Sequence, residues 1–81
     1  MREVGIVVRK HIAAGTKSER DAIVLATGRG DFVLRRAGAN PFMDPELAAL
    51  IGRRVECVGE VVAGYTFLAT SVSLIDPEPA P

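Results

Sequence analysis

The sequence predicts an all-β domain with a small helical contribution: a five-stranded Greek-key barrel with one short helix between the third and fourth strands. Five apolar segments rich in β-branched residues alternate with turn residues, and no long helical pattern joins two strands. A length of 81 residues suits one domain, and 48% hydrophobic residues can form one compact core. Because only 5% of the residues are aromatic, Val, Ile, Leu and Ala must build most of that core.

The N-terminal half is expected to hold three strands. Residues 3–9 are β-branched and flanked by charge, which predicts the first strand. The polar stretch 9–21 follows as a long loop, into whose start the first strand can run. Residues 22–27 and 32–36 form the second and third strands, and the glycines of turn 28–31 supply the positive φ of a tight hairpin.

The clearest local signal is a helix start at Asp44. Its carboxylate can accept hydrogen bonds from the first free backbone N–H groups, and Pro45 suits the first helical position. Glu46 favours the positive end of the helix dipole. The helix is predicted over residues 45–51, with Gly52 ending it. Its apolar face consists of Leu47, Leu50 and Ile51.

Two alternating segments predict the last two strands. Residues 53–62 form the fourth strand, with Gly59 as a bulge or bend. Residues 65–75 form the fifth strand, after a hairpin turn at Ala63-Gly64. The expected inward residues are Val55, Cys57 and Val61 on the fourth strand and Leu68, Val72 and Leu74 on the fifth. Residues 1–75 are therefore one barrel domain, and the Pro-rich acidic segment 76–81 is a disordered tail.

This element order is the OB arrangement, and span 3–75 resembles an OB-fold domain. The segments GTKSER, LRRAGANPF and DPELAALIGRRVECVGEV are also similar to those of small bacterial OB-like proteins of unassigned function. The resemblance implies a fold and a binding role for one barrel face. It implies no specific activity.

Enzyme and metal chemistry have little support in the sequence. Cys57 is the only cysteine and lies in an apolar strand pattern, which favours a small buried hydrophobe. His11 is the only histidine, and no second histidine or cysteine stands at ligand spacing from it. Arg29-Gly30-Asp31 spells an adhesion tripeptide but is better explained as a hairpin turn. We expect no cofactor, no metal and no enzymatic activity.

The net charge is zero, but it is unevenly distributed. Residues 1–36 hold eight basic and four acidic residues, whereas residues 37–81 hold two basic and six acidic ones. This asymmetry allows a basic patch, with an ordinary solvated surface as the alternative. No secretory signal and no apolar run of membrane-spanning length is present, so a cytoplasmic location is expected.

Two functions stay open at this point. The first is weak binding of single-stranded DNA or RNA, through a basic loop and the face of strands two and three. Its candidate residues are Lys17, Arg20, Arg35, Arg36 and Tyr65. The second is a protein-interaction module that uses an open sheet edge or an apolar patch and binds no nucleic acid. The oligomeric state does not follow from the sequence.

Overall fold

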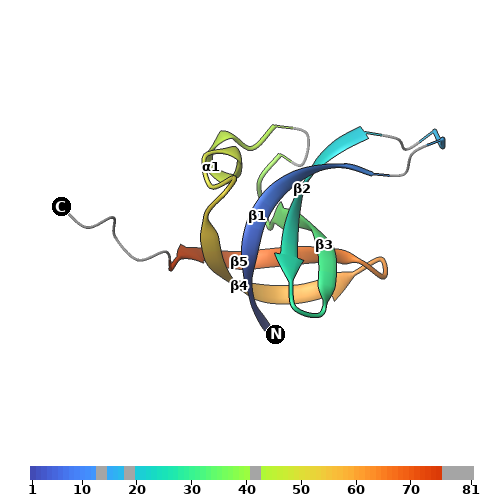
Figure 1. Ribbon diagram of the computed structural model, residues 1–81. Helices are drawn as coiled ribbons and strands as arrows, with labels where there is room; N and C mark the ends of the chain where they lie inside the picture. The colour runs from blue at the N-terminus through green and yellow to red at the C-terminus, as the bar shows by residue number, and fades with distance from the viewer. Residues whose placement is uncertain (13–14, 18–19, 41–42, 76–81) are drawn as a thin grey trace.

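The computed structural model describes residues 1–12, 15–17, 20–40 and 43–75 (Figure 1). One sheet closes into a barrel with the strand order β1-β2-β3-β5-β4, and β4 pairs with β1. Five strands and little helix confirm the predicted all-β architecture, and the predicted tail 76–81 lies outside the described residues. The elements are β1 (Arg2–Ile12), β2 (Arg20–Thr27), β3 (Gly30–Arg36), α1 (Pro45–Ala48), β4 (Arg54–Val62) and β5 (Thr66–Leu74).

Four of the five strand pairs are antiparallel, and the pair of β3 with β5 is parallel. The predicted hairpin of β2 and β3 is confirmed, with Thr27 opposite Gly30. The Thr27 hydroxyl stabilises this turn, because it donates to the Gly30 carbonyl at 2.7 Å and accepts from the Arg29 N–H at 3.1 Å. The long link from β3 to β4, which contains α1, lets β5 lie between β3 and β4.

β1 and β2 are longer than predicted. We expected a loop over 9–21, but β1 continues to Ile12 and β2 begins at Arg20. Polar residues enter the ladder here because each finds a cross-strand neighbour: Lys10 opposes Ala22, and His11 opposes Asp21. The His11 Nδ1 lies 2.9 Å from an Asp21 carboxylate oxygen, which supports this register at the surface.

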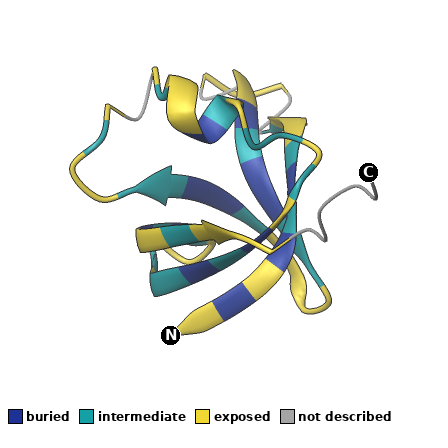
Figure 2. Cartoon of the chain, turned by 90° about the vertical axis from the view of Figure 1, so that its left-hand side faces the viewer, coloured by how far each residue is buried: buried dark blue, intermediate teal, exposed yellow. Residues whose placement is uncertain are grey.

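Aliphatic side chains from all five strands and α1 fill the barrel. Figure 2 shows buried residues alternating with exposed ones along the strands, as one buried face per strand requires. Phe32 packs edge-on against the buried Phe67, with ring centroids 6.2 Å apart. Phe32 therefore supports the core. The buried cluster is Val7, Leu25, Leu34, Leu47, Val55, Cys57, Phe67 and Ala69.

The predicted inward face of β5 is wrong in its first half. Phe67 and Ala69 are buried there, and Leu68 is only half-buried. A register shift at Val58/Gly59 places an extra residue in β5 and reverses the side-chain alternation. Val72 beyond this bulge packs against the core, as expected, but Leu74, also expected to point inward, is 48% exposed. The predicted inward positions on β5 are therefore correct only at Val72.

The helix is shorter than the predicted 45–51. After Ala48 the chain continues in turns, with Leu50 and Ile51 donating to carbonyls three residues back. Gly52 then takes a positive φ of 90° and donates to the Val7 carbonyl at 2.6 Å, which draws the chain onto β1. Only Leu47 is fully buried, and Leu50 and Ile51 are partly buried. No helix in the described ranges is long and apolar enough to cross a membrane.

Candidate functional site

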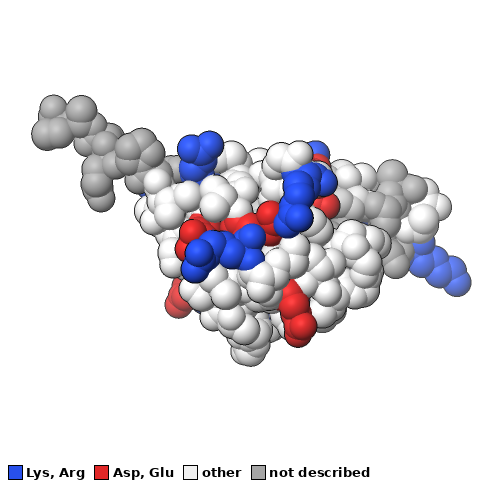
Figure 3. Space-filling view, turned by 90° about the horizontal axis from the view of Figure 1, so that it is seen from below, with Lys and Arg blue, Asp and Glu red and all other residues white. Residues whose placement is uncertain are grey.

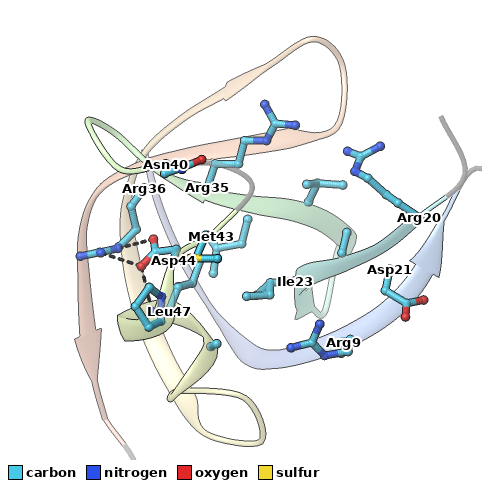
Figure 4. Close-up of a pocket in the computed structure, with 15 residues that line it drawn as sticks. Arg9, Arg20, Asp21, Ile23, Arg35, Arg36, Asn40, Met43, Asp44 and Leu47 are labelled. Carbon is cyan, nitrogen blue, oxygen red and sulfur yellow. Dashed lines mark hydrogen bonds and ion pairs between the residues drawn. The ribbon is translucent and has the colours of Figure 1, made fainter.

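The barrel wall has an opening between β2 and β3. The two strands pair only from Val24–Val33 to the turn. Beyond that point residues 20–23 pair with β1, and residues 34–36 pair with β5, so the strands separate. A pocket of about 320 Å³ lies in this opening, and α1 forms one of its sides (Figure 4).

Four arginines line this opening, which we call the arginine pocket. Arg9 comes from β1, Arg20 from β2, and Arg35 and Arg36 from β3. The acidic side chains among the described lining residues are Asp21 and Asp44, so this described part of the lining carries a surplus of positive charge. The lining is completed by Ala22, Ile23, Val33, Leu34, Asn40, Met43, Pro45, Leu47 and Ala48.

Arg36 is held by two carboxylates at the start of α1. Its Nε and Nη2 donate to the two oxygens of Asp44 at 2.7 Å each, and Nη1 donates to Glu46 at 3.0 Å. The same Asp44 carboxylate caps the helix by accepting from the Leu47 N–H at 3.2 Å. The hydrogen bonds from Arg36 hold the pKa of Asp44 below its usual range, and those bonds in turn raise the pKa of Arg36. The charge of Arg36 is thus compensated inside the fold.

Arg9 and Arg35 have no such compensation. Neither side chain makes a hydrogen bond or ion pair with the residues that the structure describes. Asp21, the other acid among the described lining residues, pairs with His11 at 2.9 Å. Arg20 and Arg35 line the opening from its two bordering strands and Arg9 lines it from β1; in Figure 4 the guanidinium groups of Arg20 and Arg35 are seen on one side of Ile23 and that of Arg9 on the other. Unlike Arg36, the guanidinium groups of Arg9 and Arg35 could therefore bind an anion at this rim without first breaking an ion pair within the described residues.

The middle of the outer β2–β3 face is less available than the sequence suggested. Lys10 on β1 and Asp31 on β3 form an ion pair across β2. Their ladder partners Ala22 and Ala26 flank Val24 on the same face, so this pair lies over Val24. Val24 is only 2% exposed. Ligand access between these strands is better at the opening than at mid-strand.

The structure brings together three of the five predicted site residues. Arg20, Arg35 and Arg36 line the arginine pocket, whereas Lys17 and Tyr65 do not. Lys17 is exposed in the short described segment 15–17. Tyr65 is 62% exposed beside β3, where its carbonyl accepts from the Val33 N–H at 2.9 Å.

Sequence reasoning missed Arg9 and Met43 as pocket residues. Arg9 follows Val7 at a spacing of two, which places it on the inward face of β1 at the barrel mouth. That signal was available once β1 was known to continue past residue 9. Met43 is 74% exposed at the pocket and lies just before the helix cap, where no periodic pattern marks it.

Comparison with known proteins adds no family. No protein-family model, no curated protein and no solved structure matches this chain. The function must therefore be argued from the site itself.

Charges at the opposite end of the barrel are mutually compensated. Figure 3 shows this end from below, with basic side chains near its centre lying against acidic ones. Arg29 in the β2–β3 turn donates to the buried Glu3, with Nε at 3.2 Å, and Arg2 lies 3.5 Å from Glu56. The uncompensated arginines of the pocket are thus distinct from the paired ones at this end.

Other chemical groups do not form a second site. Cys57 is fully buried, and this burial raises the pKa of its thiol to about 11, so the reactive thiolate is scarce at neutral pH. Across the described ranges no three His, Cys, Asp or Glu side chains come together as a metal site.

Proposed function

We propose that this chain is an OB-type barrel that binds single-stranded nucleic acid weakly, through its phosphate backbone, at the arginine pocket. The strand order and the position of α1 between β3 and β4 support the OB assignment. The observation that carries the binding proposal is that Arg9, Arg20 and Arg35, which come from three different strands, all line one opening. Arginine guanidinium groups suit phosphate oxygens in charge and in geometry.

The proposal is of a binding module and not of an enzyme. Of the two carboxylates in the described part of the pocket, Asp44 is bound to Arg36 and Asp21 to His11. Both groups therefore have structural partners. The zero net charge of the chain implies modest affinity, in the micromolar range or weaker.

The test is a titration of a labelled mixed-sequence single-stranded 12-mer, followed by fluorescence anisotropy at several salt concentrations. Three phosphate contacts predict a log–log salt slope of about −2, because each contact to a single strand contributes about −0.7. Arg35→Ala should weaken binding of all sequences alike and reduce the slope by about 0.7, since phosphate contacts carry no base information.

Arg2→Ala is the matched control. It removes the same charge from the chain, but Arg2 pairs with Glu56 and does not line the pocket. Equal weakening by both variants would show that diffuse charge, and not the pocket, attracts the strand. No binding at millimolar protein would contradict the proposal.

A protein partner is the second candidate, and the strand separation favours it. Two strand segments border the opening, residues 20–23 of β2 and residues 34–36 of β3. Their facing edges do not pair with each other. An extended peptide could add to one of these edges by main-chain hydrogen bonds. A structure of a peptide complex with new β-ladder bonds at these residues would favour this candidate over the first.

A further inference from the structure

The interior of the arginine pocket differs in chemistry from its rim. Ile23 of β2, Leu34 of β3 and Leu47 of α1 line it, Ile23 half-buried and the two leucines almost fully buried, and none of these side chains carries a polar atom. Met43 adds a flexible thioether at the edge. An apolar interior and a cationic rim therefore meet within one small space (Figure 4).

A ligand that matches both parts must itself have two parts. A phosphate alone would satisfy the rim arginines but would leave the apolar interior filled with water. An uncharged ring alone would fill the interior. It would also shield the arginine guanidinium groups from water without offering them a negative charge, which is unfavourable. A nucleotide joins a flat ring to an adjacent phosphate, so it can occupy both parts at once.

The size of the pocket limits how much of a strand enters. Its volume of about 320 Å³ lies at the small end of the range of about 300–1,000 Å³ found for ligand sites. It therefore accepts one ring system and not a run of stacked bases. A base in a duplex is paired and stacked, so only an unstacked base can enter without a large cost.

We infer that the arginine pocket holds one unstacked nucleobase of a bound strand, with the phosphates next to that nucleotide at the rim arginines. This inference rests on the proposed function and names the element of the strand that the pocket recognises. Among the residues that the structure describes, none of those lining the pocket is aromatic. The base is held by aliphatic contacts and by arginine planes, and stacking on Tyr65 is not required.

The first test compares a single-stranded oligothymidine with an abasic strand of the same length and charge. The base-bearing strand should bind about tenfold more tightly, since burial of a few apolar atoms has that order of effect. Equal affinity for the two strands would overturn the base pocket while leaving phosphate binding at the arginines intact. Absence of binding by both strands would reject the proposed function itself.

The second test introduces a larger side chain on α1 so that it occupies the pocket. Ala48 lines the pocket, whereas its neighbour Ala49 is exposed and does not. Ala48→Met should abolish the preference for the base-bearing strand and leave the affinity for the abasic strand unchanged. Ala49→Met, with the same change of side chain, should behave as the parent chain. A preference that survives in a folded Ala48→Met variant would contradict the inference.

A third measurement needs no substitution. Addition of millimolar uridine monophosphate should shift the NMR methyl signals of Ile23, Leu34 and Leu47 through the ring current of the base. Ribose 5-phosphate carries the same phosphate without a ring and should leave these methyl signals in place. If the two compounds cause the same methyl shifts, or neither causes any, the base does not enter the pocket.

Discussion

Among single residues, Asp44 and Arg36 show how one contact can change the role of a predicted binding residue. The sequence marked Asp44 as a helix cap and Arg36 as a phosphate contact. In the structure Asp44 caps α1 and also accepts two hydrogen bonds from Arg36. Arg36 therefore joins β3 to the helix, and our binding proposal rests instead on Arg35, its neighbour on the opposite face of β3.

The Arg36–Asp44 pair predicts a pH dependence of stability. Because the folded-state pKa of Asp44 is lowered, its contribution is complete above its unfolded pKa and is lost as the pH falls through the folded value. Asp44→Asn keeps a capping side chain but removes the charge. The parent chain should be more stable than this variant by a constant margin above about pH 5, where the unfolded carboxyl is ionised.

Urea denaturation at a series of pH values measures this margin. It should shrink toward zero as the pH falls below the lowered pKa of Asp44. A margin that grows on acidification would contradict the assignment of the pair as stabilising.

At the scale of elements, the β4–β5 hairpin depends on one close approach of two backbones. A Cβ atom on Gly59 would lie 2.0 Å from the Leu68 carbonyl oxygen and 2.8 Å from the Ala69 Cα. Both are main-chain atoms, which cannot turn aside as a flexible side chain can. The irregularity predicted at Gly59 is found as a register shift at Val58/Gly59, but the extra residue lies on β5 and not on β4, which explains why the inward phase of β5 changes.

Gly59→Ala should therefore destabilise the chain by about 1–3 kcal/mol or more, because the added methyl group forces the two strands apart. Gly28→Ala is the matched control, since a Cβ there meets no atom within 4 Å. Thermal unfolding by circular dichroism compares the two. Similar midpoints for both variants would show that the bulge relaxes without cost.

At the scale of the whole molecule, the barrel has a small core that α1 helps to close. Leu47 is 2% exposed and belongs to the buried cluster with residues from the strands. In a domain of 81 residues the total free energy of unfolding is only about 4–12 kcal/mol, at 0.05–0.15 kcal/mol per residue. One side chain can therefore carry a large share of it.

Leu47→Ala should cost about 2–4 kcal/mol, whereas Leu50→Ala should cost less because Leu50 is only partly buried. Urea titration should show a lower midpoint with an unchanged m-value, as expected for loss of stability in one cooperative unit. A larger loss for Leu50→Ala would mean that the turn after α1, and not the helix, closes the barrel.

Local patterns in the sequence determined the five strands, the β2–β3 hairpin, the Asp44 cap and the burial of Cys57. Each depends on neighbours close in the chain: alternation along a strand, glycines in a turn, or a side chain beside free N–H groups. The length of β1, the short helix and the phase of β5 depend instead on partners distant in sequence. β1 extends because Lys10 pairs with Ala22 of β2, and the helix stops short where the Gly52 N–H bonds to the Val7 carbonyl. The phase of β5 changes at its register shift against β4.

The residues of the candidate site also divide into those that the sequence predicted and those that only the structure revealed. The sequence singled out Arg20, Arg35 and Arg36 as basic residues near one face, because charge and strand position are local properties. Three features depend on the tertiary structure alone. Arg9 lines the same pocket, the Arg36 guanidinium is bound by the Asp44 carboxylate, and Tyr65 lies outside the pocket. The physical reason is the separation of β2 from β3, since a gap between two strands arises from the pairing of each with another neighbour.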